Sequence, residues 1–245
     1  MNRGIYSLAN GMLASQHAMD LIANNLANVN TQGFKQDQIL FNDALQKSLS
    51  SPGGQQQLGG IGTGPVEQAQ YTDFTQGGIS ETSNSNDLAL MGPGMFAIQG
   101  QNGQVMYTRN GSFIASADGT LTDAKGNAVL DASLNPVKVR PGEMHVSGRG
   151  EISTGSDTNA YTQIGIFNGS FSKTDSGLFA STNAQAQKPD AGGTKIKQGA
   201  VEGSNVSPVT TMVQMISLQR SFDMAQKSIQ SEDDMTQQLN SVLTS

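Results

Sequence analysis

The residue types that most often carry out chemistry are few in this sequence, and they lie far apart. The two histidines are His17 and His145, and neither has a second histidine, a cysteine or a carboxylate pair at ligand spacing. The chain contains no cysteine, which excludes disulfides, thiolate catalysis and cysteine-ligated metals. We therefore expect no catalytic residue, no metal site, no cofactor and no small-molecule substrate.

Three short stretches resemble chemical motifs but lack what those motifs require. The acidic run 232–234 would point in different directions on a helix, which is typical of a solvated face. The GPGMFA segment (92–97) has strand-like sequence on both sides, so no helix N-terminus follows to hold a phosphate. The GGIGTG segment (59–64) lacks the Lys-Ser/Thr of a phosphate-binding loop. These observations argue against an enzyme, and a peptidoglycan hydrolase stays the enzymatic alternative.

The composition favours a chain that contacts other protein more than water. Charged residues make up 14% of the 245 residues, against roughly 25% in typical soluble domains. The net charge is −6 without any basic block, which argues against nucleic-acid binding. No apolar run approaches the ~20 residues of a transmembrane helix. The N-terminus lacks the apolar core of a signal peptide, so we expect a cytosolic chain or export without cleavage.

Two heptad helices are predicted at the ends of the chain. The first spans residues 3–30, and Gly33 is its expected stop. The second follows Ser207, a good N-cap, with Pro208 in its first turn. The apolar positions that alternate at spacings of three and four form the predicted seam: Ile5, Leu8, Met12, Met19, Ile22, Leu26, Val29, Met215, Leu218, Phe222, Ala225, Ile229, Leu239 and Leu243.

Between these helices, residues 79–200 read as β-structure. Short apolar runs are separated by the dipeptides Asn102-Gly103, Asn110-Gly111 and Asp118-Gly119, which are strong hairpin signals. The sequence therefore predicts an α+β fold, with a β-rich domain inserted between long N- and C-terminal heptad helices. The expected boundaries are residues 1–33 and 201–245 for the two helices, 34–75 for a connecting segment and 76–200 for the β-rich domain.

The N-terminal helix nearly lacks charge. Between Arg3 and Lys35 the single charged residue is Asp20, and the faces beyond the seam offer Ala, Ser, Asn and Gln. Such a helix can pack on several sides without stranding a buried charge. We expect its asparagines to face other subunits of a helical assembly. The alternative is an intramolecular helix pair that covers the β-rich domain, with the seam residues as ordinary core.

Five segments together resemble the bacterial flagellar rod and hook proteins. They are ANNLANVNTQGFK (23–35), TQGGISETSNSNDLALMGPGMFAI (75–98), YTRNGSF (107–113), VEGSNVSPV (201–209) and QRSFDMAQKSIQSEDDMTQQL (219–239). They occur in order along the chain, and only parts of 36–70 and 130–195 match loosely. The residues that carry this signature are Asn24, Asn25, Leu26, Asn28, Gly33, Phe34, Gly203, Ser204 and Asn205.

The resemblance implies an axial protein of the flagellar basal body, in the periplasmic rod. In this family the terminal helices form a coiled-coil-like inner domain, D0, and the β-rich part forms an outer domain, D1. Subunits build a helical tube around a narrow channel. The resemblance further implies export by the flagellar type III apparatus, with copies of the chain and other axial proteins, from the export gate to the hook, as partners.

Within this family the sequence favours the proximal rod subtype over the distal one. The IYSLANGM start, the SNVSPV segment and the compact length resemble the proximal subtype. The IGTGPV and TQGGISETSNSNDLAL segments resemble the distal subtype equally well. The hook subtype is disfavoured, since it carries further outer domains. Outside the family, a flagellum-independent secreted adhesin stays the alternative.

Overall fold

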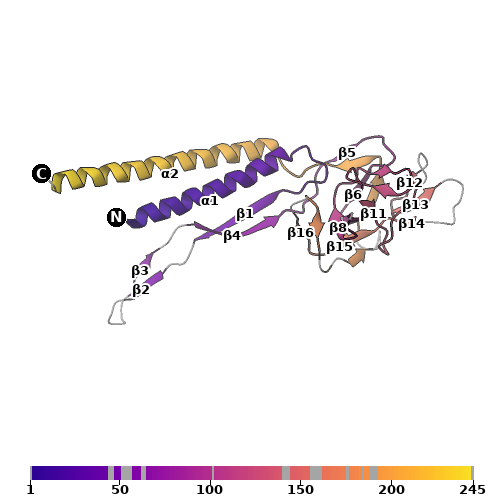
Figure 1. The fold of residues 1–245 in the computed structure, drawn as a ribbon, viewed down its shortest axis with the longest axis horizontal. Helices are drawn as coiled ribbons and strands as arrows, with labels where there is room; N and C mark the ends of the chain where they lie inside the picture. Colours follow the sequence, from indigo (N-terminus) through magenta and orange to yellow (C-terminus); the bar gives the residue numbers. More distant parts are fainter. Residues whose placement is uncertain are drawn as a thin grey trace. The chain divides into compact units, whose positions relative to one another are not determined.

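The computed structural model describes residues 2–43, 47–50, 57–61, 65–100, 102–139, 144–154, 162–174, 177–181, 183, 185–187 and 193–243. Parts of the predicted connecting segment and of the GGIGTG stretch therefore lie outside the described residues. The chain divides into two compact units (Figure 1). We call residues 1–27, 37–73 and 207–245 the helical unit, and residues 28–36 and 74–206 the β-rich unit.

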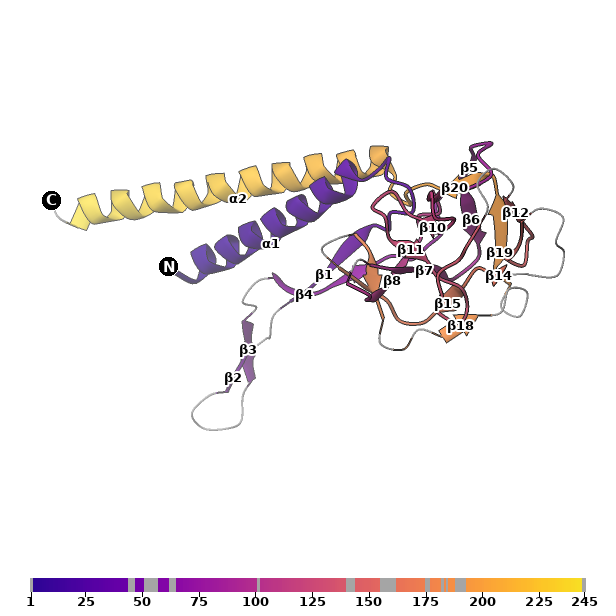
Figure 2. The ribbon, with the colours of Figure 1, turned by 45° about the vertical axis from the view of Figure 1, so that its right-hand side comes forward.

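The described part of the helical unit contains two helices and four strands. Helix α1 (Asn2–Ala27) and helix α2 (Pro208–Leu243) lie side by side and antiparallel (Figures 1 and 2). Strand β1 (Asp37–Asp43) pairs antiparallel with β4 (Pro65–Thr72), and α1 packs on this ribbon as well as on α2. Strands β2 (Lys47–Ser50) and β3 (Gln57–Ile61) form a second antiparallel pair. The helices and ribbon thus give α1 neighbours on two sides.

The helix ends differ in how well the sequence predicted them. Helix α2 begins at Pro208 as predicted, and the Thr211 amide donates to the Ser207 carbonyl at 3.0 Å. Helix α1 ends at Ala27, three residues before the predicted end. A turn follows, in which the Thr31 amide donates to the Asn28 carbonyl at 3.1 Å. Gly33 is therefore not the helix stop, because it lies six residues past the last helical residue.

The β-rich unit contains short antiparallel strands. Its largest sheet has the order β16-β17-β8-β7-β11-β10-β9, with β15 joining β7 to β18. These strands are β7 (Met95–Gln99), β8 (Val105–Thr108), β9 (Ile114–Ala115), β10 (Leu121–Thr122), β11 (Ala128–Val129), β15 (Ile166–Asn168), β16 (Ser172–Lys173), β17 (Phe179–Ala180) and β18 (Gln185–Gln187).

The described part of this unit also contains three smaller sheets. Strand β5 (Ile79–Glu81) pairs with β20 (Ala200–Glu202), and β6 (Leu88–Met91) pairs with β19 (Lys195–Gln198). A three-stranded sheet contains β12 (Met144–Val146), β13 (Glu151–Thr154) and β14 (Thr162–Gln163). Two helices with sheets between them in sequence confirm the predicted α+β class.

Two of the three predicted hairpin turns are present. The Asn102-Gly103 turn joins the paired strands β7 and β8, and Asp118-Gly119 joins β9 and β10. Asn110-Gly111 is not a hairpin turn, since β8 pairs with β7 and β17 whereas β9 pairs with β10. At Gly111 a side chain would meet the Leu88 carbonyl oxygen at 1.7 Å, so this glycine permits a close approach of two backbones.

The hydrophobic core lies inside the β-rich unit. Its largest cluster contains Leu88, Phe96, Ile98 and Leu121, all at most 1% exposed, and Phe96 packs edge-on against Phe113 at 5.3 Å. A second cluster surrounds Phe167 and Phe179. Neither described helix is long and apolar enough to cross a bilayer.

Candidate functional site

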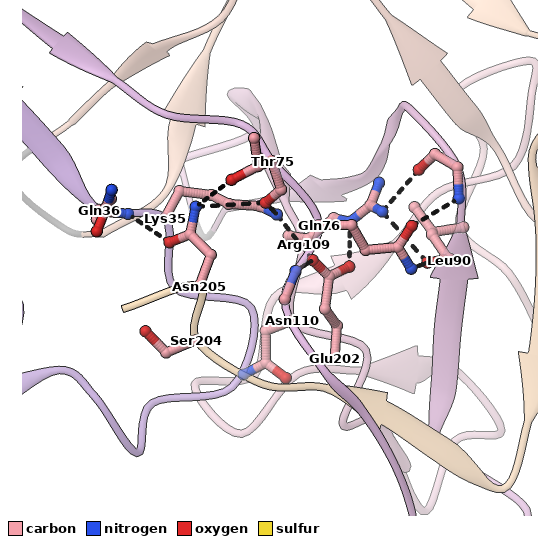
Figure 3. Close-up of polar contacts among 12 residues, drawn as sticks. Lys35, Gln36, Thr75, Gln76, Leu90, Arg109, Asn110, Glu202, Ser204 and Asn205 are labelled. Atoms are coloured by element: carbon pink, nitrogen blue, oxygen red, sulfur yellow. Dashed lines mark hydrogen bonds and ion pairs between the residues drawn. The ribbon is translucent and has the colours of Figure 1, made fainter. Parts of the chain in front are cut away.

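Three charged side chains from distant parts of the sequence meet inside the β-rich unit (Figure 3). Lys35 lies in the segment that follows α1, Arg109 directly follows β8, and Glu202 ends β20. Their exposed fractions are 2%, 4% and 1%. Because charged residues are almost never fully buried unless paired, this cluster needs a physical account.

Glu202 is the centre of this cluster. Its Oε1 atom accepts a hydrogen bond from Lys35 Nζ at 2.7 Å and another from the Gly77 amide at 2.9 Å. Its Oε2 atom accepts from Arg109 Nε at 2.5 Å. One carboxylate therefore neutralises part of the charge of two cations, and both of its oxygens are satisfied.

Backbone carbonyls accept further hydrogen bonds from the two cations. Lys35 Nζ donates to the Thr75 carbonyl at 2.6 Å. The guanidinium of Arg109 donates to the carbonyls of Leu90 at 3.2 Å, Gly92 at 2.7 Å and Gly94. Gly92 and Gly94 have φ angles of +116° and +126°, which non-glycine residues rarely adopt. The GPGMFA segment is thus part of the binding site for an arginine side chain of the same chain.

A layer of polar contacts continues from the cluster toward the two segments that flank the helices in sequence. The Gly33 amide donates to the Glu202 carbonyl at 2.8 Å, and the Gln36 amide donates to Asn205 Oδ1 at 2.8 Å. Lys173 Nζ lies 3.9 Å from the centroid of the Phe34 ring, a cation–π contact. Residues 28–36 and 202–206 are therefore held side by side within the β-rich unit.

The arrangement holds distant segments of the β-rich unit together. Every charged atom of the cluster is engaged by a carboxylate or a backbone group, and the described residues contain no set of three metal-ligating side chains. Removing one partner from a buried ion pair typically costs about 3–5 kcal/mol, because it leaves an unpaired charge in a low-dielectric interior. We infer that the cluster has a structural role, which is to hold distant segments of the β-rich unit together.

Most of the predicted seam residues have partly buried side chains. Their side chains are half-buried at Leu8, Met12, Met19, Ile22, Leu26, Val29, Met215, Leu218, Phe222, Ala225 and Ile229. Leu239 is 50% exposed, and Val29 lies past the end of α1. The side chains of Ile5 and Leu243 are not among those described. A role of these residues in assembly stays a prediction.

The signature asparagines do not all face outward as expected. Asn25 is only 6% exposed, since its side chain is paired with the backbone of Asp37: Nδ2 donates to the Asp37 carbonyl at 2.8 Å, and Oδ1 accepts from the Asp37 amide at 3.0 Å. The expectation that this residue meets another subunit is therefore wrong. Asn24 is exposed, and Asn28 is half-buried.

The glycine and serine residues of the signature lie in tight backbone contacts of the β-rich unit. Gly33 is buried with φ +67°, and a side chain there would meet the Asn110 amide nitrogen at 2.4 Å. The Gly203 amide donates to the Gly78 carbonyl at 2.7 Å. The Ser204 hydroxyl accepts from the Val206 amide at 3.2 Å.

The sequence analysis did not select Lys35, Arg109 or Glu202 as site residues. Each is the single charged residue within its short family segment, GFK, YTRNGSF or VEGSNVSPV. Isolated charges of opposite sign among small and apolar neighbours were the available signal. Their pairing could not be found without the fold, because 167 residues separate Lys35 from Glu202.

Three family models match this chain, and each covers one member of the charged cluster. The model described as "Flagella basal body rod protein" matches residues 5–35. The model "Flagellar hook protein FlgE/F/G D1 domain" matches residues 89–154. The model "Flagellar basal body rod FlgEFG protein C-terminal" matches residues 197–242.

Similar proteins align over almost their full length. The flagellar basal-body rod protein FlgG of Borreliella burgdorferi is 33% identical, with 96% of both chains covered. FlgG of Bacillus subtilis is 31% identical with 98% of both chains covered, and FlgF of Caulobacter vibrioides is 29% identical with 96% covered. The chain belongs to the flagellar basal-body rod protein family of the FlgF/FlgG type.

Proposed function

We propose that this chain is a structural subunit of the hollow flagellar rod and polymerises through its terminal helices. Its family is structural, and its relatives are named as rod proteins. The observation that carries the proposal is the surface of the helical unit. Helix α2 leaves eight large apolar side chains about half or more exposed, from Val209 to Val242, while α1 contains two charged residues in 26. An apolar, weakly charged surface is typical of a protein-protein interface.

The proposed mechanism is mechanical. Contacts between the helices of neighbouring copies would bury apolar area, worth roughly 25 cal/mol per Å². A heterologous contact that does not close on itself repeats in every copy and produces a helical polymer. Modest contact energies then sum into a stiff shaft that transmits motor torque to the hook.

Leu26→Asp tests the part of the helices in assembly. Leu26 is half-buried near the end of α1, so a charge there should block incorporation into rods and abolish swimming while the β-rich unit stays folded. The matched control is Asn102→Asp in the exposed β7–β8 turn, which should leave swimming unchanged. Swimming cells that carry Leu26→Asp in intact rods would contradict the proposal.

We further propose that the chain is exported by the flagellar type III apparatus. We also propose that it is the proximal rod subtype, FlgF. Relatives named FlgG and FlgF both match at about the same identity, so the distal position is the second candidate. Imaging of basal bodies from a deletion strain distinguishes the two. Basal bodies that lack everything beyond the proximal rod would support the proximal position. Basal bodies that retain an intact proximal rod would support the distal position.

Mass spectrometry of purified hook–basal bodies tests the assignment as a whole. The chain should be present in them, and absent from the medium of cells without the export apparatus. Its appearance in the medium or on the envelope of such cells would support the secreted adhesin instead.

A further inference from the structure

Helix α2 has a group of exposed apolar side chains in its first turns. They are Val209, Met212, Val213 and Ile216, with exposed fractions between 49% and 72%. Their spacing places them on one face, about half a turn away from the half-buried residues Met215 and Leu218. We call these four residues the N-terminal patch.

A second group lies near the other end of the same helix. Met235, Leu239 and Val242 are 56%, 50% and 73% exposed, and their spacing of four and three places them on one face. We call these three residues the C-terminal patch. The two patches are separated by about 40 Å, at about 1.5 Å of helix per residue from Met212 to Leu239.

The charged residues of α2 lie between the two patches along the helix. All charged residues of α2 fall within residues 220–234, and residues 208–219 and 235–243 contain none. The N-terminal patch therefore lies among uncharged neighbours, and the C-terminal patch is followed by uncharged residues but begins directly after the acidic run 232–234. Packing the N-terminal patch, or the C-terminal patch around Leu239 and Val242, against another apolar surface buries few charges, whereas packing the middle of the helix would cost desolvation of ionised groups.

We propose that the N-terminal patch of one copy packs against the C-terminal patch of the next copy. This inference rests on the proposed rod function and names the partner of the helical surface. A helical polymer needs two different surfaces on each subunit that fit one another, since a patch that pairs with itself closes a dimer. The two patches are different surfaces because they lie at opposite ends of α2, and both are apolar, so each can bury the other. Each contact displaces the next copy along the helix axis. The charged middle of α2, residues 220–234, stays outside the contact.

The absence of cysteine makes the proposal directly testable by disulfide trapping. The full-length double variant Met212→Cys with Leu239→Cys replaces the native chain in flagellated cells. Because a disulfide requires Cα atoms within about 7 Å, these two positions cannot be bridged within one α2 helix. Oxidation of purified basal bodies should produce a ladder of dimers and larger multimers that reductant collapses.

Two controls keep this result specific. Each single variant should produce no ladder. The matched double variant Ser221→Cys with Ser231→Cys places both thiols at exposed positions of the charged middle and should produce none either. Dimers from either single variant would show that a patch pairs with itself and would overturn the head-to-tail contact.

The outcomes separate this inference from the proposed function. Variants found in basal bodies by mass spectrometry without any ladder would overturn the contact and leave the rod function standing. Absence of the native chain from basal bodies would overturn the rod function itself.

If the cysteine pair blocks incorporation, a charge pair replaces it. Val213→Asp and Leu239→Lys should each reduce incorporation, and the two together should restore it in part. A double variant no better than either single one would overturn the contact.

Discussion

The two units of this chain treat charge and apolar surface in opposite ways. The β-rich unit buries three charged side chains around Glu202, and its core residues such as Phe96 and Leu121 are completely inaccessible. In the helical unit, the charged side chains of α2 are exposed or half-buried, and large apolar side chains such as Val209 and Val242 are exposed. The first unit is stabilised by contacts within itself. The second has an apolar surface that another protein can cover.

Because of this difference, substitutions in the two units should change two different measured quantities. Substitutions in the β-rich unit should change the free energy of unfolding of the isolated chain. Substitutions on the exposed faces of α2 should leave that free energy nearly unchanged and alter incorporation into rods. Hydrogen exchange read by mass spectrometry can follow the two units separately, so each prediction below can be assigned to one of them.

The largest effect is expected at the charged cluster. Glu202→Gln removes the carboxylate shared by two buried cations and should destabilise the β-rich unit by about 3–5 kcal/mol. Denaturant unfolding of the purified chain measures this. The matched control is Glu81→Gln, which removes a carboxylate from an ion pair at the surface. Equal losses of unfolding free energy for the two variants would contradict the structural role of the cluster.

Two glycine substitutions should act in opposite directions. Gly33→Ala places a methyl group in the left-handed region and against the Asn110 amide, and should cost at least about 1–2 kcal/mol. Gly11→Ala in α1 meets no atom within 4 Å and should stabilise the helix by about 0.5–1 kcal/mol. Thermal unfolding of both variants tests the pair. A Gly33→Ala melting temperature equal to that of the native chain would refute the close packing.

Asn25 tests whether the helical unit has its own internal polar contact. Asn25→Ala removes both side-chain hydrogen bonds to the buried backbone of Asp37 and should cost about 1–3 kcal/mol. The exchange protection of α1 and β1 should fall with it. Asn24→Ala, at the exposed neighbouring position, should change stability much less. A larger loss of stability for Asn24→Ala than for Asn25→Ala would support the expectation from the sequence that Asn25 faces outward.

The smallest effect is expected at the surface ion pair between β5 and β19. Lys197 Nζ lies 2.5 Å from Glu81 Oε1, and this hydrogen bond, followed by the charge of Lys197, lowers the pKa of Glu81. The pair is solvent-exposed, so Lys197→Ala should leave the melting temperature unchanged at neutral pH. Any contribution would be present above the ordinary carboxyl pKa and lost as the pH falls through the lowered one. A clear loss at neutral pH would contradict this assignment.

Local patterns predicted much of the fold. Ser207 and Pro208 marked the start of α2, and the dipeptides at residues 102–103 and 118–119 marked two hairpins. These features depend on backbone preferences of neighbouring residues, which a sequence shows directly. The end of α1 and the conformation at Asn110-Gly111 were predicted wrongly, since tertiary contacts there outweigh local preference.

The sequence by itself determined the fold class, the family and the low charge of the terminal helices. Only the tertiary structure decided that Lys35, Arg109 and Glu202 form one site, and that Asn25 points inward to the backbone of Asp37. Composition and periodicity depend on residues close together in the chain. Pairing of buried charges depends on how distant segments pack, because each charge must find its partner before water can be excluded.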